Sequence, residues 1–301
     1  MPTPQNHHVQ HRQSQHSGRW VVILLLVVIC VMAFYSWRVA RLLGADMWDF
    51  RPSEMVAAQY SAKDVIGDLG GMPVKISKHA AENVEYDGDP GFGGPPRHGP
   101  PPERTYTSRL KSFGFDVRFP DMAMLTSKEM WADKNNYTIY NTQWMRVSIT
   151  SGESFPGRGF MNRPPVSNGQ TKGDYWWNTY EELPVKKFGL TEYRLVGIDP
   201  RTGQPARDHR EATIIYIHRD RDGKVLTRID CDNVPHEAVR CTQSWSMEAN
   251  NMDAEVGVHY RRGFLRDWSE IQKRVTKVIL DFRIEPNNKE MAQTPNTISA
   301  L

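Results

Sequence analysis

The chain has 301 residues, a formal net charge of +3, an aromatic content of 10% and nine Trp residues. This aromatic content excludes a disordered chain. The charge is mild and spread along the sequence, with no Lys/Arg block interleaved with aromatics, which argues against a nucleic-acid-binding protein. Roughly 240 residues remain once both ends and an apolar run are set aside, enough for one large domain or two small ones.

The apolar run, residues 20–37, is 18 residues long and carries no charge. As a helix it would measure about 27 Å, close to the roughly 30 Å hydrocarbon core of a bilayer. A buried core helix is the alternative, but helices of water-soluble domains usually carry a polar stripe. The run therefore predicts a transmembrane helix.

The residues around the run match neither a signal-peptide cleavage site nor a lipidation site well. A cleavable signal peptide has an apolar stretch of about 7–15 residues followed by a small-x-small site. The downstream candidate Leu43-Gly44-Ala45 begins with Leu, and Cys30 is preceded by Ile29, which does not suit lipidation. We therefore expect an anchor that is not cleaved.

The arginines flanking the run do not decide its orientation. Arg12 and Arg19 precede it, and Arg38 and Arg41 follow it, so the rule that basic loops stay in the cytoplasm gives a tie.

Two cysteines give the orientation instead. Cys231 and Cys241 lie close together, and their spacing lacks the paired C-x-x-C units of a zinc site. A disulfide is the simplest interpretation, with two buried free thiols as the alternative. A disulfide indicates an oxidising compartment. The expected location is the bacterial inner membrane, as a single-pass protein with a cytoplasmic N-terminus and a periplasmic main domain.

The composition changes along the chain and predicts six segments. These are a disordered cytoplasmic tail at 1–19, the transmembrane helix at 20–37, a juxtamembrane helix and short strand at 38–86, a Pro/Gly-rich loop at 87–104, a periplasmic α+β domain at 105–285 and a disordered tail at 286–301.

Most of the large domain reads as strands, because alternating or β-branched apolar runs are bounded by turn residues. The runs are 74–76, 113–119, 137–140, 144–149, 190–198, 212–218, 224–231, 241–247 and 255–260. Asp222-Gly223 predicts a hairpin turn. Residues 265–282 carry one apolar face at helical spacing. The expected fold class is α+β: an N-terminal transmembrane helix, then a largely antiparallel sheet domain with a C-terminal amphipathic helix.

An aromatic cluster suggests a binding patch. Tyr175, Trp176 and Trp177 open a stretch, 175–182, that we expect to form a short helix. Trp and Tyr are enriched at binding hot spots, so the cluster is a candidate partner-binding patch. Packing into the core is the alternative and the more common outcome.

The sequence is poor in catalytic signatures. It has no Gly-x-Ser-x-Gly elbow, no phosphate-binding Gly-x4-Gly-Lys and no His-Glu-x-x-His. Asp220–Gly223 resembles part of a calcium loop, but the later ligands are missing, and a hairpin turn is the better interpretation. An acid–base site can be imagined from His218, His236, His259, Asp230 and Asp232, although nothing orders them toward a nucleophile. We expect no enzyme activity, no catalytic or cofactor-binding residue, no bound metal and no cofactor.

Six segments together resemble a group of proteobacterial single-span envelope proteins, mostly uncharacterised, over roughly residues 47–283. The segments are 67–74, 85–90, 112–122, 188–193, 219–227 and 260–268. Some members of this group resemble immunity proteins of type VI secretion lipase effectors. The resemblance implies a binding protein whose partner is a secreted lipase-type effector, and it transfers no catalytic motif.

Two functions follow from these observations. One is a membrane-anchored periplasmic immunity protein that neutralises such an effector, since long loops on a rigid sheet suit partner recognition. The alternative is a structural or assembly component of a cell-envelope complex.

Overall fold

The computed structural model describes Met32 and residues 61, 63–90, 99–138, 140–163, 180–199, 202–209 and 212–285. The chain divides into two units, residues 1–58 and 59–301, and all described residues except Met32 belong to the second. The predicted tails at 1–19 and 286–301 lie outside the described residues, as do the predicted span at 20–37, apart from Met32, and residues 38–60.

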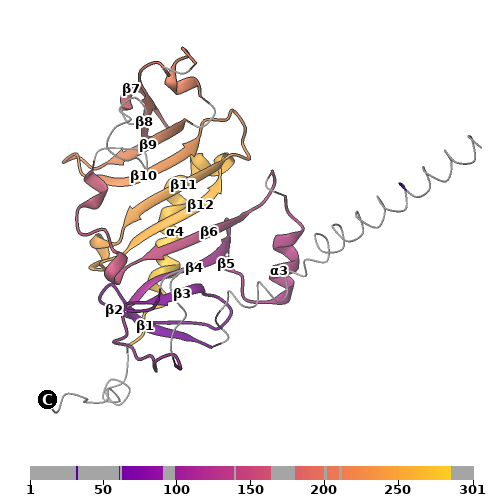
Figure 1. Cartoon of the computed structure of the whole chain (residues 1–301), viewed down its shortest axis with the longest axis vertical. Coiled ribbons are helices and arrows are strands. Elements are labelled where there is room, and N and C mark those ends of the chain that lie inside the picture. Colours follow the sequence, from indigo (N-terminus) through magenta and orange to yellow (C-terminus); the bar gives the residue numbers. More distant parts are fainter. Residues whose placement is uncertain are drawn as a thin grey trace, which may run out of the picture. The chain divides into compact units, whose positions relative to one another are not determined.

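The second unit is built mainly from strands (Figure 1). They are β1 (Val65–Leu69), β2 (Met72–Ile76), β3 (Glu82–Tyr86), β4 (Leu110–Arg118), β5 (Ala123–Met124), β6 (Trp144–Thr150), β7 (Tyr180–Lys187), β8 (Leu190–Leu195), β9 (Thr213–Arg219), β10 (Val225–Asp232), β11 (Arg240–Ser246) and β12 (Glu255–Arg261). The helices are α3 (Lys128–Asn135), α4 (Trp268–Leu280) and the short 3₁₀ turns η1 (Gly152–Ser154), η2 (Phe160–Asn162), η4 (Ala206–Asp208), η5 (Glu248–Asn250) and η6 (Arg262–Asp267).

The predicted fold class and location need correction. Among the described residues, no helix is long and apolar enough to cross a membrane. The longest, α4, has 13 residues and an amphipathic surface, so it spans only about 20 Å against the roughly 30 Å that a bilayer core requires. The observed fold is a mostly antiparallel β-sheet with one C-terminal helix. The predicted transmembrane helix and single-pass inner-membrane location are not supported.

Among the described residues, ten strands form one sheet, in which the neighbouring strands run antiparallel. The order is β3-β4-β6-β12-β11-β10-β9-β8-β7, with β5 paired to β4, while β1 and β2 form a separate hairpin. Six strands that are consecutive in the chain, β7 to β12, are also neighbours in the sheet. The turn between β9 and β10 uses Gly223 at a φ of 82°, a conformation that costs glycine little.

Helix α4 covers one face of the sheet. Its buried residues are Trp268, Ile271, Val275 and Ile279, which recur at three- and four-residue spacing. The helix crosses several strands, because the Thr227 hydroxyl on β10 hydrogen-bonds Gln272 at 2.5 Å, and the Phe115 ring on β4 lies 5.5 Å from that of Phe282 just beyond the helix. The predicted amphipathic helix is confirmed, beginning slightly later than expected because η6 precedes it.

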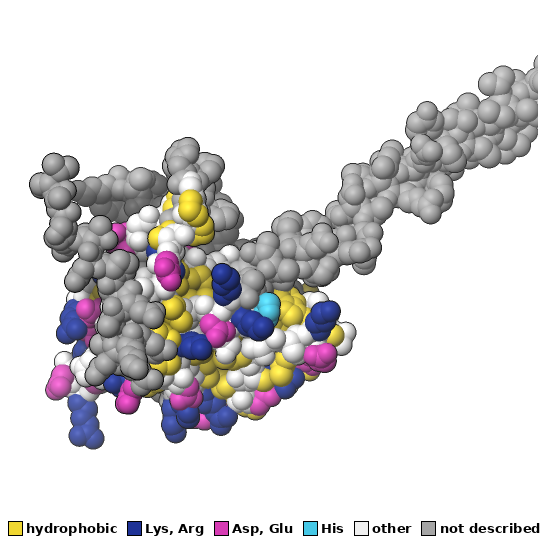
Figure 2. Space-filling view, turned by 90° about the horizontal axis from the view of Figure 1, so that it is seen from below, with side chains coloured by type: hydrophobic (Ala, Val, Ile, Leu, Met, Phe, Trp, Pro, Cys, Tyr) yellow, Lys and Arg dark blue, Asp and Glu magenta, His cyan; other side chains and the backbone are white. Residues whose placement is uncertain are grey.

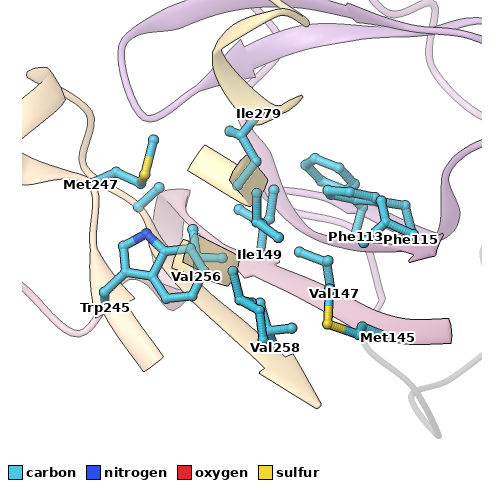
Figure 3. Close-up of a cluster of buried hydrophobic side chains, with 14 of the residues drawn as sticks. Phe113, Phe115, Met145, Val147, Ile149, Trp245, Met247, Val256, Val258 and Ile279 are labelled. Atoms are coloured by element: carbon cyan, nitrogen blue, oxygen red, sulfur yellow. The ribbon is translucent and has the colours of Figure 1, made fainter. Parts of the chain in front are cut away.

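The core lies between α4 and the sheet. Ile279 faces side chains of β4, β6 and β12, among them Phe113, Val147 and Val256 (Figure 3). These strand residues alternate with polar ones on the opposite face, where Asp116, Arg146, His259 and Thr242 follow one another across neighbouring strands in register. The central strands of the sheet therefore have one apolar face and one mainly polar face, which agrees with the alternation predicted for β4.

Several local expectations are wrong. Residues 65–69 form a strand where the end of a juxtamembrane helix was expected, and residues 180–182, the end of the short helix expected at 175–182, belong to β7. Described residues of 137–140 form a turn instead of a strand, whereas β3 and α3 have no counterpart in the expected elements. In the Pro/Gly-rich segment 87–104, the described residues contain neither helix nor strand, as predicted.

Candidate functional site

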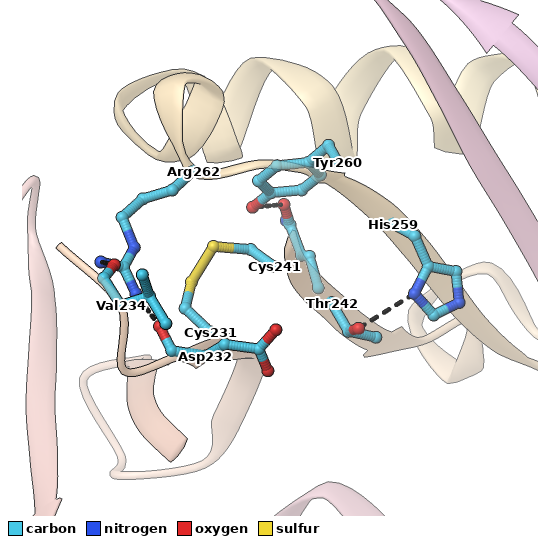
Figure 4. Close-up of a disulfide and its surroundings, with 9 residues drawn as sticks. Cys231, Asp232, Val234, Cys241, Thr242, His259, Tyr260 and Arg262 are labelled. Atoms are coloured by element: carbon cyan, nitrogen blue, oxygen red, sulfur yellow. Dashed lines mark hydrogen bonds between the residues drawn. A yellow bond between two sulfur atoms is a disulfide. The ribbon is translucent and has the colours of Figure 1, made fainter. Parts of the chain in front are cut away.

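The predicted disulfide is confirmed. Cys231, near the end of β10, and Cys241, near the start of β11, face each other across the two strands with Cα atoms 4.1 Å apart (Figure 4). Both residues are buried against the core. The bond therefore joins neighbouring strands at the base of the loop 233–239, and the alternative of two free thiols is excluded.

Arg262 holds the same loop from a second side. Its guanidinium donates hydrogen bonds to the carbonyl oxygens of Val234, at 2.6 Å, and Asp232 (Figure 4). Its backbone N–H also donates to the carbonyl oxygen of Val239 at 2.7 Å. Because Arg262 directly follows β12, these bonds tie the loop to the end of a central strand. The loop is thus fixed by a covalent bond and by backbone hydrogen bonds.

This fixed loop presents an exposed pair of rings. His236 in the loop meets Tyr140, from the connection between α3 and β6, edge to face with ring centroids 5.3 Å apart. The Tyr140 side chain is 62% exposed, and His236 is exposed as well. The Nδ1 atom of His236 accepts the Ala238 N–H at 2.9 Å, which sets the plane of the imidazole. We call Tyr140 and His236 the Tyr140–His236 pair.

Two arginines lie at the strand ends next to the loop 233–239. Arg240 and Arg261 are directly opposite each other on β11 and β12, and the Arg261 guanidinium donates to the carbonyl oxygen of Thr142 at 3.1 Å. Within the described part of the chain, neither arginine forms a salt bridge. Like charges directly opposite in a sheet are unfavourable, so this arrangement lowers stability locally. Tyr and Arg are also both enriched at binding hot spots.

The histidines of the imagined acid–base site do not meet. His218 lies against the Trp268 ring of α4, with centroids 5.0 Å apart. His259 lies on the other face of the sheet, where its Nδ1 shares a 2.9 Å hydrogen bond with the Thr242 hydroxyl. His236 is in the disulfide loop, and Asp230 is engaged by Arg228 at 2.7 Å. The period-2 alternation of strands is what puts His218 and His259 on opposite faces.

Burial shifts the titration of several groups near these strands. It lowers the pKa of His259, and the positive charges of Arg240 and Arg146 lower it further. It raises the pKa of Glu255 on the same face, against the opposing effect of Arg228. On the helix side, burial raises the pKa of the Tyr260 hydroxyl, which donates to Gln243 at 2.9 Å.

The segment Asp220–Gly223 is a hairpin turn, as predicted. One carboxylate oxygen of Asp220 accepts the backbone N–H groups of Asp222 at 3.0 Å and Lys224 at 2.9 Å. The aspartate therefore closes the turn in the manner of an Asx turn. Among the residues that the structure describes, no group of three His, Cys, Asp or Glu side chains is arranged to hold a metal ion.

The predicted partner-binding patch falls outside the part of the chain that the structure describes. Tyr175, Trp176 and Trp177 lie outside the described residues. The Tyr140–His236 pair and Arg262 were missed by sequence reasoning, which read residues 137–140 as a strand and His236 as an ordinary loop histidine. The one available signal was the disulfide spacing, which marks 233–239 as a closed loop but does not show what packs against it.

Surface charges of both signs are interspersed. Figure 2, a view from below, shows Lys and Arg side chains alternating with Asp and Glu over the described surface, with apolar patches between them. Charges mixed in this way on one face largely cancel at long range.

Neither a protein-family model nor a curated protein matches the sequence. Among solved structures, the chain is similar to Smlt3025, described as an immunity protein of the Stenotrophomonas maltophilia type IV secretion system. The identity is 18%, the TM-score is 0.49, and the alignment covers 75% of this chain and 95% of that one. A similarity of this size establishes neither a shared function nor a shared partner.

Proposed function

We propose that this chain is a protein-binding protein that neutralises a secreted effector, as immunity proteins do. The observation that carries the proposal is the exposed Tyr140–His236 pair on a loop fixed by the Cys231–Cys241 disulfide. An aromatic side chain that is already ordered loses little conformational entropy when it is buried by a partner, so more of the contact energy remains as affinity.

The arginine that directly follows the loop 233–239 supports the same proposal. Arg240 is exposed and has no salt bridge among the described residues, which leaves its guanidinium available to a partner's carboxylate. Arg can bind a carboxylate through two parallel N–H donors, which gives orientation as well as attraction. The surface therefore suits a folded protein that presents an acidic group beside an apolar recess.

We further propose a class for this effector. The six sequence segments that resemble the envelope-protein group support a type VI lipase-type effector as the partner. The test is to express the effector encoded beside the gene in cells with and without this chain and to follow survival. Protection by the chain is the expected result, and equal killing in both cultures contradicts the proposal.

Substitutions then locate the binding surface. We expect Tyr140→Ala combined with His236→Ala to weaken effector binding by about tenfold or more, since hot-spot truncations typically cost over 1–2 kcal/mol. The matched control is Ile198→Ala, which truncates another apolar side chain that is 56% exposed. Isothermal titration calorimetry with purified proteins measures both affinities. An affinity equal to that of the control variant assigns binding to another surface.

A further inference from the structure

The hairpin tip between β7 and β8 carries an unusual residue. Lys187 pairs with Leu190, so Phe188 and Gly189 alone form the turn. Both have positive φ, 54° for Phe188 and 79° for Gly189. Two-residue hairpin turns of this kind favour Asn, Asp or Gly at both positions, and a bulky residue at positive φ is strained. Phe188 therefore lowers stability where Asn would suit the backbone.

Phe188 is nevertheless held in a fixed position. Its carbonyl oxygen accepts a 3.0 Å hydrogen bond from the indole N–H of Trp268, at the start of α4. The Trp268 side chain is itself buried and lies against His218. The Phe188 side chain, in contrast, is 48% exposed, and the Lys187 ammonium lies over its ring face at 5.8 Å from the centroid. The backbone of the tip is anchored while its aromatic ring is presented to solvent.

The surroundings of the ring are basic. Thr191 pairs with Ile217, which places the tip beside the turn that connects β9 and β10. Exposed cations border this region, and none of them forms a salt bridge with a described residue: Lys186, Lys187, Arg221 and Lys224. The carboxylates of the neighbouring turn are Asp220, whose carboxylate accepts backbone N–H groups, and Asp222. Positive charge therefore predominates around the exposed ring.

We propose that the β7–β8 tip is a second contact point for the effector, at which Phe188 enters an apolar pocket rimmed by carboxylates. This inference rests on the proposed function and adds the chemistry of the partner's surface. Burying the ring removes apolar area from water, and the lysines meet the acidic rim. A strained, anchored and exposed aromatic is explained by such a contact, because strained residues persist where the surrounding structure and the function maintain them.

The variant Phe188→Asn separates binding from folding. Asn tolerates positive φ, so we expect the midpoint of thermal unfolding to stay the same or rise. Affinity for the effector, measured by calorimetry, is expected to fall by about tenfold or more. Ile198→Asn is the matched control and should bind as the wild type does. Combined with Tyr140→Ala, Phe188→Asn should multiply the loss in affinity, because separate contacts contribute additively to the free energy of binding.

A charge-reversal variant tests the acidic rim independently. Lys187→Glu combined with Lys224→Glu should weaken binding and flatten its dependence on salt, since two attractive charge interactions are lost. If Phe188→Asn or this variant binds as tightly as the wild type, the tip is not a contact point, although the proposed function stands. If the wild type does not bind the effector, both proposals fail. Binding of the wild type to phosphatidylglycerol vesicles that Phe188→Asn abolishes, with effector affinity unchanged, makes the tip a membrane contact and overturns the inference.

Discussion

Single residues on the polar face of the sheet show how position changes chemistry. His259 and His218 both lie in strands, and the sequence around each of them does not show that their environments differ. Its cross-strand neighbours are Arg146 on β6 and Thr242 on β11, and Arg240 lies close by. Burial and two positive charges therefore disfavour the imidazolium, while His218 meets an aromatic ring. Neither environment is visible without the register of the strands.

This environment predicts a pH dependence of stability. The pKa of His259 is lower in the folded chain than the value of about 6.5 expected in the unfolded chain. As pH falls through that range, the unfolded state takes up the proton first, so stability is full above about pH 6.5 and is lost as pH falls toward the folded pKa. Replacing His259 with Gln should reduce this loss.

Urea unfolding at a series of pH values between 8 and 5 is the measurement (a range of about three units around the unfolded pKa). The difference between wild type and His259→Gln isolates this histidine from other titrating groups. His209→Gln is the control, because it removes a histidine that lies outside the strands of the sheet, in the segment before β9. Parallel pH curves for wild type and His259→Gln contradict the prediction.

At the scale of elements, the β10–β11 connection combines two constraints. The disulfide closes a loop between residues ten apart in sequence, and Arg262 bonds the same loop to the end of β12. Each acts on a different state of the chain: the covalent bond restricts the unfolded chain, whereas the hydrogen bonds exist only in the folded one. Both constraints hold the loop that carries His236 of the Tyr140–His236 pair.

Removing the disulfide should therefore destabilise the chain. We expect Cys231→Ala combined with Cys241→Ala to lower the free energy of unfolding by about 2–3 kcal/mol on the chain-entropy model. Guanidinium unfolding measures the change, and adding reductant to the wild type should reproduce it. Reductant should leave the double variant unaffected. A larger loss in the variant than in the reduced wild type would show that alanine also leaves cavities in the core.

At the scale of the whole molecule, the β1–β2 hairpin joins distant parts of the chain. The Asp68 N–H donates to the carbonyl oxygen of Ser108 at 2.8 Å, and the Asp253 N–H donates to that of Gly70 at 2.9 Å. On its other strand, the hairpin bonds to the segment after α4, where the Lys75 N–H donates to the carbonyl oxygen of Phe282 at 2.9 Å. The hairpin also contributes apolar residues to the main core.

Gly70 allows this close approach. Its φ is 57°, and a Cβ added there would lie 2.6 Å from the backbone oxygen of Asp253. We expect Gly70→Ala to cost roughly 2–4 kcal/mol, because strain at positive φ is joined by a clash with backbone. Gly71→Ala is the control: its φ is also positive, but the nearest atom would be 4.0 Å away, so only about 1–2 kcal/mol is expected. Equal losses in the two variants, measured by urea unfolding, contradict the role given to the contact.

The elements missed by sequence reasoning share a physical cause. Helix α3 buries no residue, so it has no apolar periodicity, and its N-terminal signal is the Ser127 hydroxyl that accepts the Met130 N–H at 3.2 Å. Strand β3 contains Glu82, which is 1% exposed and pairs with Arg146 of another strand. In a sequence, a Glu predicts an exposed position, because the residue that pairs with it far along the chain is not known.

The sequence by itself determined the features that short-range patterns encode. Alternation predicted β4, β6 and β9 to β12, helical spacing predicted α4, Asp222-Gly223 predicted a turn, and the spacing of Cys231 and Cys241 predicted their bond. Only the tertiary structure decided which strands far apart in the chain are neighbours, that His218 and His259 lie on opposite faces, and that Tyr140 meets His236. Those relations join residues far apart along the chain, and they are set by strand register and by packing against α4, which no local pattern specifies.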